Sequence, residues 1–549
     1  TKLRYRESME QPLIAPSRRA VFNWRLAAAV VATLCATALV ATFFFNDLEN
    51  TSAVVHGVCD HAHDAKESCL AVVAEVSNQG VYRDRLLDEL LMDSFSRVNE
   101  AFHRARLLAF SSNDVRTRAG LNTCVELMDL SKDRITNTMN ALRNADSGIS
   151  DAHTWLSTVL TNHVTCLDEI TNQEEDLLYS QLNDLVLRAR TILAVLVRTY
   201  SLSTVATGVP KGRYPSWLTR KDRMLLRAEG KNVAANSVVA KDGSGQYTTI
   251  SDAVDAAPAN SKTRYVIYVK KGIYKEKVQI AKKNIMLVGD GMGSTIVTGS
   301  SNVVDGDTTY NSATVAAVGD GFMAQDMCFQ NTAGPEKHQA VALRVGADQA
   351  VINRCKIDGY QDTLYAHSNR QFYRDCYITG TVDFIFGNAA VVFQSCNIVP
   401  RKPMPNQSNM VTAQGRTDPN QNTGTSIQNC NIVASSDLQP VKTSFRSYLG
   451  RPWKVYSRTV YSRTVVMQSN IGDCIEPAGW SEMEGSTDLS TLYYGEYLNR
   501  GPGSSTGKRV SWAGYHVMKA SDAQKFTVVN LIQGDAWLDS AYVTFSPGL

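Results

Sequence analysis

Four polar residues in the C-terminal half of the chain are spaced in a way that could build a catalytic site. Gln339, Gln361 and Asp383 follow one another at intervals of 22 residues, and Asp362 comes directly after Gln361. If one coil of the fold takes that many residues, the three side chains stack roughly 4.8 Å apart, and the two aspartates lie on adjacent coils. Paired carboxylates drive their pKa values apart, so one can keep a proton while the other stays anionic. With glutamine amides as oxyanion donors, the set predicts hydrolysis of a carbonyl compound.

A cation and several aromatic residues accompany these groups. Arg451 can form two hydrogen bonds to a carboxylate and would keep one aspartate ionised. Trp453 comes two positions later, and Tyr365, Phe384 and Phe386 lie near the aspartates in the sequence. Their flat faces could support sugar rings or apolar ester groups, although each aromatic residue taken singly is more often part of a core.

Two other patterns are weaker. Gly503–Gly507 fits the G-x-S-x-G pattern of serine hydrolases around Ser505, but no apolar strand precedes it, as a nucleophile elbow requires. His61 and His63 have no clustered third ligand and favour a solvated helix start over a metal site. No metal site and no cofactor are predicted. The 56 basic and 53 acidic residues nearly balance, which gives no support for a nucleic-acid partner.

The C-terminal part of the chain contains a loose repeat that would position the polar residues. Strand-length apolar segments occur there, such as 264–270 and 284–290, and 29 of the 35 glycines follow residue 229. Five similar segments each contain a cysteine, with gaps of 27, 21, 20 and 34 residues: Cys328, Cys355, Cys376, Cys396 and Cys430. Repetition at just over twenty residues is typical of a parallel β-helix. The alternative is a β-sandwich, whose turn signals would come about every 8 to 12 residues.

The preceding part of the chain has the composition of packed helices. Residues 51–205 contain no proline and only four glycines. Segments 84–110 and 174–200 repeat apolar residues at spacings of three and four, which predicts a small helical bundle over 50–205. Its four cysteines, at separations of 10 and 42 residues, suit one short-range disulfide and one between two helices, namely Cys59–Cys69 and Cys124–Cys166.

The N-terminal region carries a segment long enough to cross a membrane. Residues 26–45 contain no charge and could span a hydrocarbon core of roughly 30 Å. Arginines precede this segment and acidic residues follow it, so the positive-inside rule places residues 1–25 in the cytosol and the rest outside. An uncleaved signal anchor and a long signal peptide both fit, and a buried core helix is the third alternative. Export permits disulfides and makes Asn50 and Asn406 candidate glycosylation sites.

Residues 206–232 are predicted to be a linker that leads into a domain at 233–549. The linker contains prolines and glycines, and six basic residues lie between Lys211 and Arg227. Within it, Arg223–Leu226 is a basic residue followed by an apolar triplet, which suits proteolytic cleavage of an exposed segment. A charged linker that is never cut fits the composition equally well.

Five segments of the C-terminal domain resemble the signature blocks of plant pectin methylesterases, in family order: Gly272–Glu276, Gln339–Arg344, Gly359–Tyr365, Gly380–Gln394 and Leu449–Trp453. The resemblance spans residues 233–549, and the helical region resembles the pectin methylesterase inhibitor domain that precedes many of these enzymes. It implies a right-handed parallel β-helix. It also implies a pectinesterase that removes C6 methyl esters from homogalacturonan, giving pectate and methanol in cell-wall modification, with pectin as partner.

The resemblance assigns roles to individual residues. Asp383 would attack the ester as nucleophile, Asp362 would donate a proton to the leaving methanol and later activate water, and Gln361 would stabilise the transition state. The remaining residues implied to contact substrate or orient the nucleophile are Thr309, Gln339, Arg451 and Trp453.

The resemblance has further implications outside the catalytic residues. It implies a disulfide near the site, for which we expect Cys376–Cys396, with Cys328–Cys355 and Cys396–Cys430 as alternatives. The linker segment resembles the family's basic-x-Leu-Leu processing site, where a protease would remove the inhibitor-like region before the enzyme, as a monomer, reaches the cell wall. The sequence departs from the family pattern after Trp453, where Tyr-Ser-Arg-Thr-Val occurs twice, at 456–460 and 461–465.

Two rival functions use similar folds or surfaces. A pectin lyase would bring calcium-binding acidic clusters, and a polygalacturonase would bring a different arrangement of aspartates. Neither pattern is visible. The alternative outside enzymes is a wall protein that binds pectin without cleaving it. Such a protein need not retain all of the five polar residues Gln339, Gln361, Asp362, Asp383 and Arg451.

Overall fold

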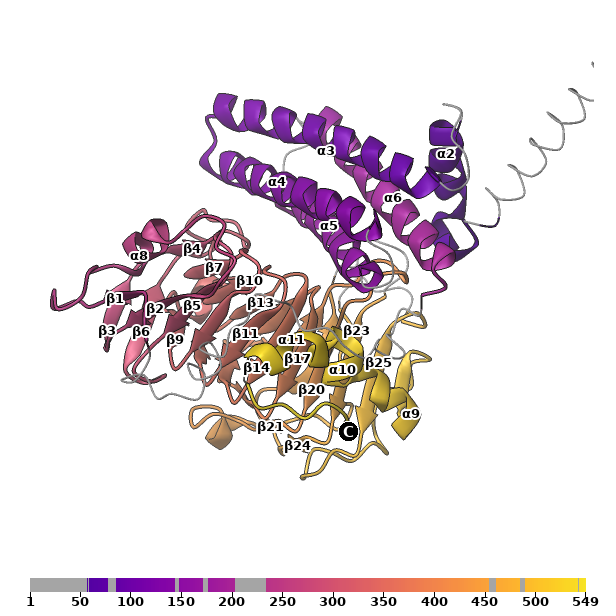
Figure 1. Cartoon of the computed structure of the whole chain (residues 1–549). Helices are drawn as coiled ribbons and strands as arrows, with labels where there is room; N and C mark the ends of the chain where they lie inside the picture. Colours follow the sequence, from indigo (N-terminus) through magenta and orange to yellow (C-terminus); the bar gives the residue numbers. More distant parts are fainter. Residues whose placement is uncertain are drawn as a thin grey trace, which may run out of the picture. The chain divides into compact units, whose positions relative to one another are not determined.

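Helices and parallel strands divide the chain between them. Helices occupy its N-terminal part up to Thr199, and strands begin at Ser237 (Figure 1). The computed structural model describes residues 57, 59–77, 85–143, 148–170, 176–202, 234–453, 461–483, 489–541 and 543–549. Residues Val58–Leu549 form one compact unit.

The N-terminal part is a bundle of long helices that follow a short 3₁₀ helix, Cys59–Ala65. The helices are α2 (Lys66–Ser77), α3 (Leu86–Ser111), α4 (Val115–Arg143), α5 (Ile149–Glu169) and α6 (Asp176–Thr199). Figure 1 shows α3 to α6 lying side by side. Apolar residues at spacings of three and four are buried along each helix, such as Leu90, Leu91 and Val98 of α3. This burial, rather than helix propensity alone, stabilises the bundle.

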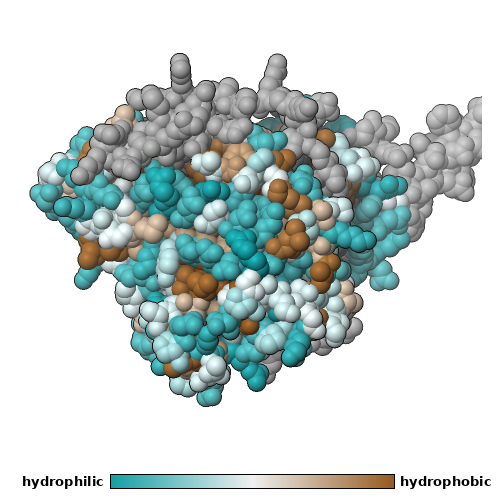
Figure 2. All heavy atoms as spheres, turned by 90° about the horizontal axis from the view of Figure 1, so that it is seen from below, coloured by the Kyte–Doolittle hydropathy of each residue, from teal (hydrophilic) through white to brown (hydrophobic). Residues whose placement is uncertain are grey.

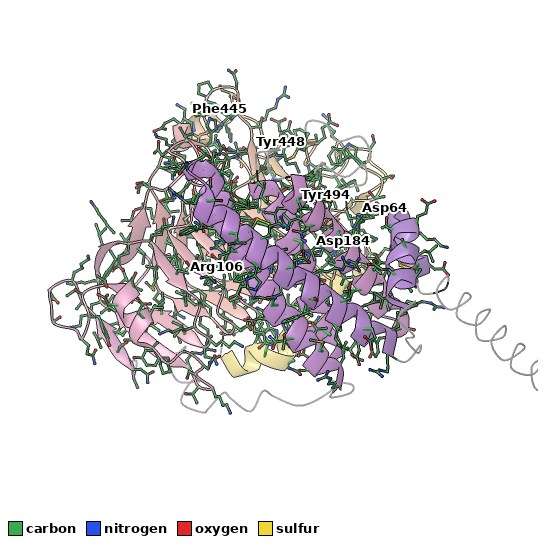
Figure 3. All side chains as sticks on the ribbon, turned by 90° about the horizontal axis from the view of Figure 1, so that it is seen from above. Asp64, Arg106, Asp184, Phe445, Tyr448 and Tyr494 are labelled. Atoms are coloured by element: carbon green, nitrogen blue, oxygen red, sulfur yellow. A yellow bond between two sulfur atoms is a disulfide. The ribbon has the colours of Figure 1, made fainter. Side chains whose placement is uncertain are left out.

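Polar and covalent contacts tie the bundle helices together. Both expected disulfides are present, Cys59–Cys69 and Cys124–Cys166. The buried guanidinium of Arg188 pairs with Glu75 and Asp93 at 2.6 Å each and with Asp184 at 2.8 Å, and thereby links α6 to α2 and α3. Figure 3 labels Asp184 within this helical part. Because three carboxylates surround one buried cation, the charge is compensated where water is excluded.

The C-terminal part is a parallel β-helix whose coils contribute strands to three sheets. The first sheet contains β1 (Ser237–Val239), β2 (Tyr265–Val269), β5 (Ile285–Val288), β8 (Met323–Gln325), β11 (Ala350–Asn353), β14 (Arg370–Arg374), β17 (Ala390–Gln394), β20 (Gly424–Gln428), β23 (Arg463–Met467), β25 (Tyr493–Tyr497) and β26 (Tyr515–Val517). The second contains β3 (Gly272–Lys275), β6 (Thr295–Gly299), β9 (Cys328–Asn331), β12 (Lys356–Asp358), β15 (Tyr377–Gly380), β18 (Asn397–Pro400), β21 (Asn431–Ile432) and β24 (Asn470–Ile471). The third contains β4 (Val278–Ile280), β7 (Val315–Ala317), β10 (Leu343–Val345), β13 (Leu364–Ala366), β16 (Ile385–Gly387), β19 (Asn409–Gln414) and β22 (Ser447–Pro452).

Identical positions of successive coils stack inside the β-helix. In the second sheet the pairing places these buried residues one above another: Phe329, Ile357, Ile378, Ile398, Ile432 and Ile471. Each side chain therefore packs on the same kind of side chain in the next coil, and the apolar core runs along the whole axis. This stacking explains why the repeat was visible in the sequence.

Short helices cover two regions of the β-helix. Helix α8 (Ile250–Ala256) buries Ile250, Ala253 and Val254 against the first coils. Near the C-terminus, α9 (Ala520–Ala523), α10 (Val528–Ile532) and α11 (Gly534–Ala541) add Leu531 and Trp537 to a second apolar cluster on the first sheet. The face in Figure 2 is mainly hydrophilic, with small, separate apolar groups, as expected of a surface in contact with water.

The expected disulfide Cys376–Cys396 is wrong in this structure, since both thiols are free and buried. The residues that follow these cysteines, Tyr377 and Asn397, are paired in register, so the two cysteines stack on adjacent parallel strands. Their Cα–Cβ bonds are then nearly parallel, a poor arrangement for a disulfide. Instead, each thiol donates to a carbonyl, Cys376 Sγ to Ile352 O at 3.3 Å and Cys396 Sγ to Tyr373 O at 3.6 Å. The alternatives Cys328–Cys355 and Cys396–Cys430 are not formed either.

Several predictions concern residues that the structure does not describe. The segment 26–45, the linker 206–232 with Arg223 and Leu226, and Asn50 lie outside the described residues and stay predictions. None of the described helices combines the length and the apolar character needed to span a membrane. Asn406 is described and exposed, as a glycosylation site must be.

The isoleucine stack generates a test of the core. We expect Ile378→Ala to lower the free energy of unfolding by about 2–5 kcal/mol, because it leaves a cavity between two neighbouring coils. The exposed Lys402 provides the control, and Lys402→Ala should change the midpoint of urea unfolding little. Equal effects of the two variants would contradict the stacked core.

Candidate active site

Two aspartates lie next to each other in the turns that precede two neighbouring strands of the third sheet. Asp362 and Asp383 each come two residues before a strand, β13 and β16, whose first pair is Leu364 with Ile385. The register therefore brings the two carboxylates onto adjacent coils, as expected. Both backbones adopt the left-handed conformation, with φ of 61° and 50°. A non-glycine residue takes this conformation at a cost, and such strain concentrates at functional sites.

The glutamines do not form the expected stack with Asp383. The pairing of β10, β13 and β16 shows that one coil takes 21 residues here, not 22. Each interval of 22 therefore moves one position along the coil, and Gln361 lies level with Val382 instead of Asp383. The segment of Gln339 still runs beside Gln361, since the Ala340 N–H donates to Gln361 O at 3.3 Å. The side-chain oxygen of Gln361 is buried without a hydrogen-bond partner among the described residues.

Arg451 fixes one of the two carboxylates. Its guanidinium, on β22, donates from Nε and Nη2 to the two oxygens of Asp383 at 2.8 and 2.7 Å. This two-point ion pair orients the Asp383 carboxylate. The pKa of Asp362 is raised well above its usual value, first by burial and second by the charge of Asp383, while Arg451 opposes the shift. The two carboxyl groups therefore differ in their surroundings: a cation compensates Asp383, whereas burial disfavours the ionised form of Asp362.

Aromatic side chains form a wall beside the aspartates. Tyr365 and Phe386 are partners across β13 and β16, and their rings stack with centroids 4.1 Å apart. Trp453 meets both edge-on, at 6.0 and 5.4 Å. Tyr310 adds a fourth ring, 6.3 Å from that of Tyr365. Phe384 does not join them, because it is fully buried in the core of the β-helix.

Thr309 lies in the long loop between β6 and β7, next to Tyr310 in that wall. It is half-buried, and its carbonyl oxygen accepts a hydrogen bond from Ser312 Oγ at 2.9 Å. The loop therefore holds Thr309 beside the aromatic wall, while the aspartates come from the short turns before β13 and β16.

The helical bundle contacts this same region. Tyr310 donates its backbone N–H to Glu169 at 3.2 Å and its hydroxyl to Glu126 at 3.0 Å. Thr165 of α5 lies 3.1 Å from the imidazole of His367, and Asn388 donates to Thr161 Oγ1 at 2.9 Å. Burial lowers the pKa of His367 to about 3, so its ring is neutral in this contact.

Little space remains between the bundle and the aromatic wall. A cavity lined by Thr161, Val164 and Thr165 on one side and by Tyr365 and Trp453 on the other has a volume of about 10 Å³. That volume holds about one water molecule. The bundle thus packs closely against Tyr365 and Trp453 of this wall.

Ion pairs extend this contact along the β-helix. Arg134 of α4 donates to both oxygens of Asp320 at 2.9 and 2.5 Å, and Asp151 of α5 pairs with Arg370 at 2.7 Å. Both arginines are buried, so the loss of a carboxylate partner would leave a buried positive charge less well compensated.

Some contact residues escaped the analysis of the sequence. Tyr310 directly follows Thr309, which was predicted to contact substrate. No functional role was predicted for His367 or Asn388. A partial signal exists for His367, because Tyr365 and His367 are two positions apart and so project from the same face of an extended segment. Their bundle partners, on α4 and α5, carry no motif.

Other candidate groups lie apart from the aspartates. Ser505 is exposed in the loop between β25 and β26, without a directly preceding strand. His61 and His63 belong to the 3₁₀ helix at the start of the bundle. Within the described residues, no group of three or more metal-ligating side chains is assembled to hold a metal ion. The second copy of the repeated pentapeptide, 461–465, overlaps the start of β23, while the first copy, 456–460, lies outside the described residues.

Comparison with known families divides the chain at the same place as the structure. The pectinesterase family model matches residues 236–535, which contain the β-helix. The family model of the plant invertase/pectin methylesterase inhibitor matches residues 53–194, which contain the helical bundle.

Individual relatives cover almost the entire chain. A pectinesterase/pectinesterase inhibitor from Ficus pumila var. awkeotsang is 55% identical, with 90% of this chain and 92% of the relative aligned. Pectinesterase/pectinesterase inhibitor 18 from Arabidopsis thaliana is 54% identical over 92% and 91% of the two chains. Among solved structures, a pectin methylesterase from carrot is 60% identical, with a TM-score of 0.56, and spans 58% of this chain and 99% of its own. The chain therefore belongs to the pectinesterase family and joins a pectin methylesterase β-helix to an inhibitor-like helical bundle.

Proposed function

We propose that Asp383 and Asp362 carry out the ester hydrolysis of this pectinesterase. The observation that carries the proposal is the two-point ion pair of Asp383 with Arg451, next to a second carboxyl group whose pKa is raised by burial. The proposal takes Asp383 as the anion and Asp362 as the acid, which is the division of roles that stepwise ester hydrolysis requires.

The reaction proceeds in two stages. The Asp383 carboxylate attacks the carbonyl carbon of a galacturonate C6 methyl ester, and the electron pair of the C=O bond moves onto oxygen. When this intermediate collapses, the bond to methoxide breaks and Asp362 supplies the proton that makes methanol. Asp362 is now a carboxylate and takes a proton from water as the water oxygen attacks the acyl carbon. The bond to Asp383 breaks, which restores the Asp383 carboxylate and the protonated Asp362, and the released galacturonic acid loses its proton to the solvent.

The remaining predicted residues assist this chemistry. Gln361 and Gln339 would donate amide protons to the oxyanion. Arg451 keeps Asp383 oriented for attack. Trp453 and Thr309 lie at the aromatic wall and would contact the sugar chain.

We also propose the handedness of the β-helix and the route by which the precursor is exported, cut and glycosylated. The β-helix is right-handed, and residues 26–45 direct the chain into the secretory pathway. A protease cuts the linker near Arg223–Leu226, and the released β-helix acts as a monomer in the cell wall. Exposure of Asn406 supports a glycan there.

Methanol release tests the proposed roles of the two aspartates. The 230–549 fragment should release methanol from highly methylated pectin, and Asp383→Ala and Asp362→Ala should each reduce the rate by at least about a hundredfold. The carrot enzyme, which aligns over nearly its full length with this region alone, supports the use of the fragment. Activity that survives in both variants would contradict the mechanism. A folded fragment that binds pectin without releasing methanol would contradict pectinesterase activity in this fragment.

The raised pKa of Asp362 predicts a gain of stability on its replacement. The folded state keeps this proton at pH values where the unfolded chain, with a pKa of about 3.9, has lost it. The free energy of unfolding therefore falls as the pH rises from about 4 through the raised pKa. Asn is isosteric and cannot ionise, so Asp362→Asn should raise that free energy by about 1 kcal/mol or more near pH 7, with a smaller effect near pH 4.

Thermal unfolding at several pH values would check this prediction. Asp383→Asn is the matched comparison, because it removes the anion that compensates Arg451 and should destabilise the protein. Destabilisation by Asp362→Asn near neutral pH would show that Asp362 is ionised in the folded state.

We further infer that the bundle keeps the β-helix inactive until the linker is cut. The bundle occupies the aromatic wall, and its contacts with Tyr310, His367 and Asn388 come from α4 and α5. The small cavity beneath it excludes substrate. Inhibition therefore follows from steric exclusion and does not require any distortion of the aspartates.

Loss of the carboxylates that bind Tyr310 should weaken this inhibition. Glu126→Ala combined with Glu169→Ala removes both hydrogen bonds to Tyr310, which together contribute about 1.5 kcal/mol or more. We expect methanol release by the uncut chain to rise about tenfold or more. The control, Glu89→Ala with Glu100→Ala on α3, alters the same number of charges away from the contact. Unchanged activity of the first variant, or an equal rise in the control, would contradict inhibition through this contact.

A further inference from the structure

A second concave site lies on the β-helix. A pocket of about 610 Å³ opens beside the first coils, where β3, β6 and β9 of the second sheet end. Its walls include Lys275 and Lys277, and the hydroxyl-bearing Thr298, Ser300 and Thr332. This volume is large enough for a monosaccharide unit and its neighbours, since ligand pockets commonly fall between roughly 300 and 1,000 Å³.

The lining of the pocket suits an anionic sugar. Hydroxyl and amide groups can bind sugar hydroxyls, and no aromatic or large aliphatic side chain takes part in the lining. Six lysines occur between residues 270 and 283, which concentrates positive charge at this end of a domain whose overall charge is small. This polar lining does not favour an apolar ligand.

The charges in the pocket leave a net positive site. Glu276 is already engaged, because its carboxylate accepts the backbone N–H groups of Ile250 and Ser251 at 3.0 Å, at the start of α8. Lys277 lies 3.6 Å from Asp307, and its side chain is still 54% exposed. Lys275 is exposed and has no ion pair among the residues that the structure describes. At least one cation is therefore available to a carboxylate from outside.

Hydrogen bonds connect the pocket to the catalytic turn. Thr298, Gln330 and Asp358 are in register on three adjacent strands, and each side chain bonds to the next, at 3.2 and 3.0 Å. Arg401 continues the row, because it donates to Asp358 at 3.3 Å and to the hydroxyl of Tyr360 at 3.0 Å. Tyr360 directly precedes Gln361 and Asp362. The nearest coil of the pocket, that of β9, directly precedes the coil of Asp362, whereas Lys275 on β3 lies three coils before it. The pocket and the aspartates both lie at turns between the second and third sheets.

We propose that this pocket binds an unesterified galacturonate unit of the polymer, with Lys275 and Lys277 facing its carboxylate. The inference rests on the proposed function for the identity of the polymer, but concerns a separate site. All of the lining residues lie between 275 and 332, and none belongs to the bundle. The uncut chain can therefore hold acidic stretches of pectin while its aromatic wall is covered. After release of the bundle, the same pocket retains the enzyme on chains that already carry free carboxylates.

Binding by the full-length chain tests this proposal. The probe is a galacturonan oligosaccharide without methyl esters, titrated calorimetrically at low salt. Lys275→Ala with Lys277→Ala should weaken binding about three- to tenfold, the effect of two exposed charge contacts, and added salt should abolish the difference. The control, Lys508→Ala with Lys519→Ala, removes the same charge from two exposed positions outside the pocket.

The outcomes separate the two hypotheses. Equal weakening in both double variants would assign binding to general charge attraction and overturn the pocket, as would no weakening in either. A fully methylated oligosaccharide should bind the parent and the Lys275/Lys277 variant equally, and a difference there would also overturn it. Failure of the proposed catalytic function would appear differently, as an absence of methanol release from any pectin while binding of the acidic oligosaccharide persists.

Discussion

The register of the third sheet is the constraint on which the catalytic arrangement depends. Because Leu364 pairs with Ile385, the two turns before these strands bring Asp362 and Asp383 together, and the pair Tyr365–Phe386 follows from the same alignment. Arg451 reaches Asp383 from β22, since β19 and β22 continue the sheet in sequence order. A shift of one position in a single coil would separate the acid, the anion and the cation at once.

In the proposed mechanism, the ion pair between Arg451 and Asp383 determines which carboxyl group attacks the ester. Without a cation, two buried carboxylates on adjacent coils would share one proton, and neither would be a reliable nucleophile. The guanidinium resolves this ambiguity in favour of Asp383. The left-handed backbone at both aspartates indicates that the fold compensates for local strain through the surrounding stacked core.

Much of this arrangement could be predicted from the sequence, and the errors have physical causes. The aspartates, Arg451 and the coil repeat were recognisable because they lie in short motifs whose chemistry is local. The glutamine stack was misplaced by one position per coil, because the coil length was set equal to the 22-residue interval between the side chains themselves, whereas the gap of 21 residues between Cys355 and Cys376 agrees with the observed pairing. Phe384 and Phe386 seemed equivalent in the sequence, yet Phe384 lies before β16, directly after the turn at Asp383, and is buried in the core, whereas Phe386 lies within β16 and joins the aromatic wall. The contacts of His367 and Asn388 with the bundle depend on tertiary packing alone, which leaves no local pattern.

The distribution of cysteines has a consequence for how the two parts can be produced. Both disulfides of the described residues lie in the bundle, while all six cysteines of the β-helix, from Cys328 to Cys474, are free and buried. Removal of the bundle therefore removes these covalent cross-links and leaves a domain held by stacking and hydrogen bonds alone. Such a domain needs no oxidising compartment to reach its native state, whereas the bundle does. A reducing cytosol should accordingly yield a folded β-helix from a shortened gene, but an incompletely cross-linked bundle from the full-length one.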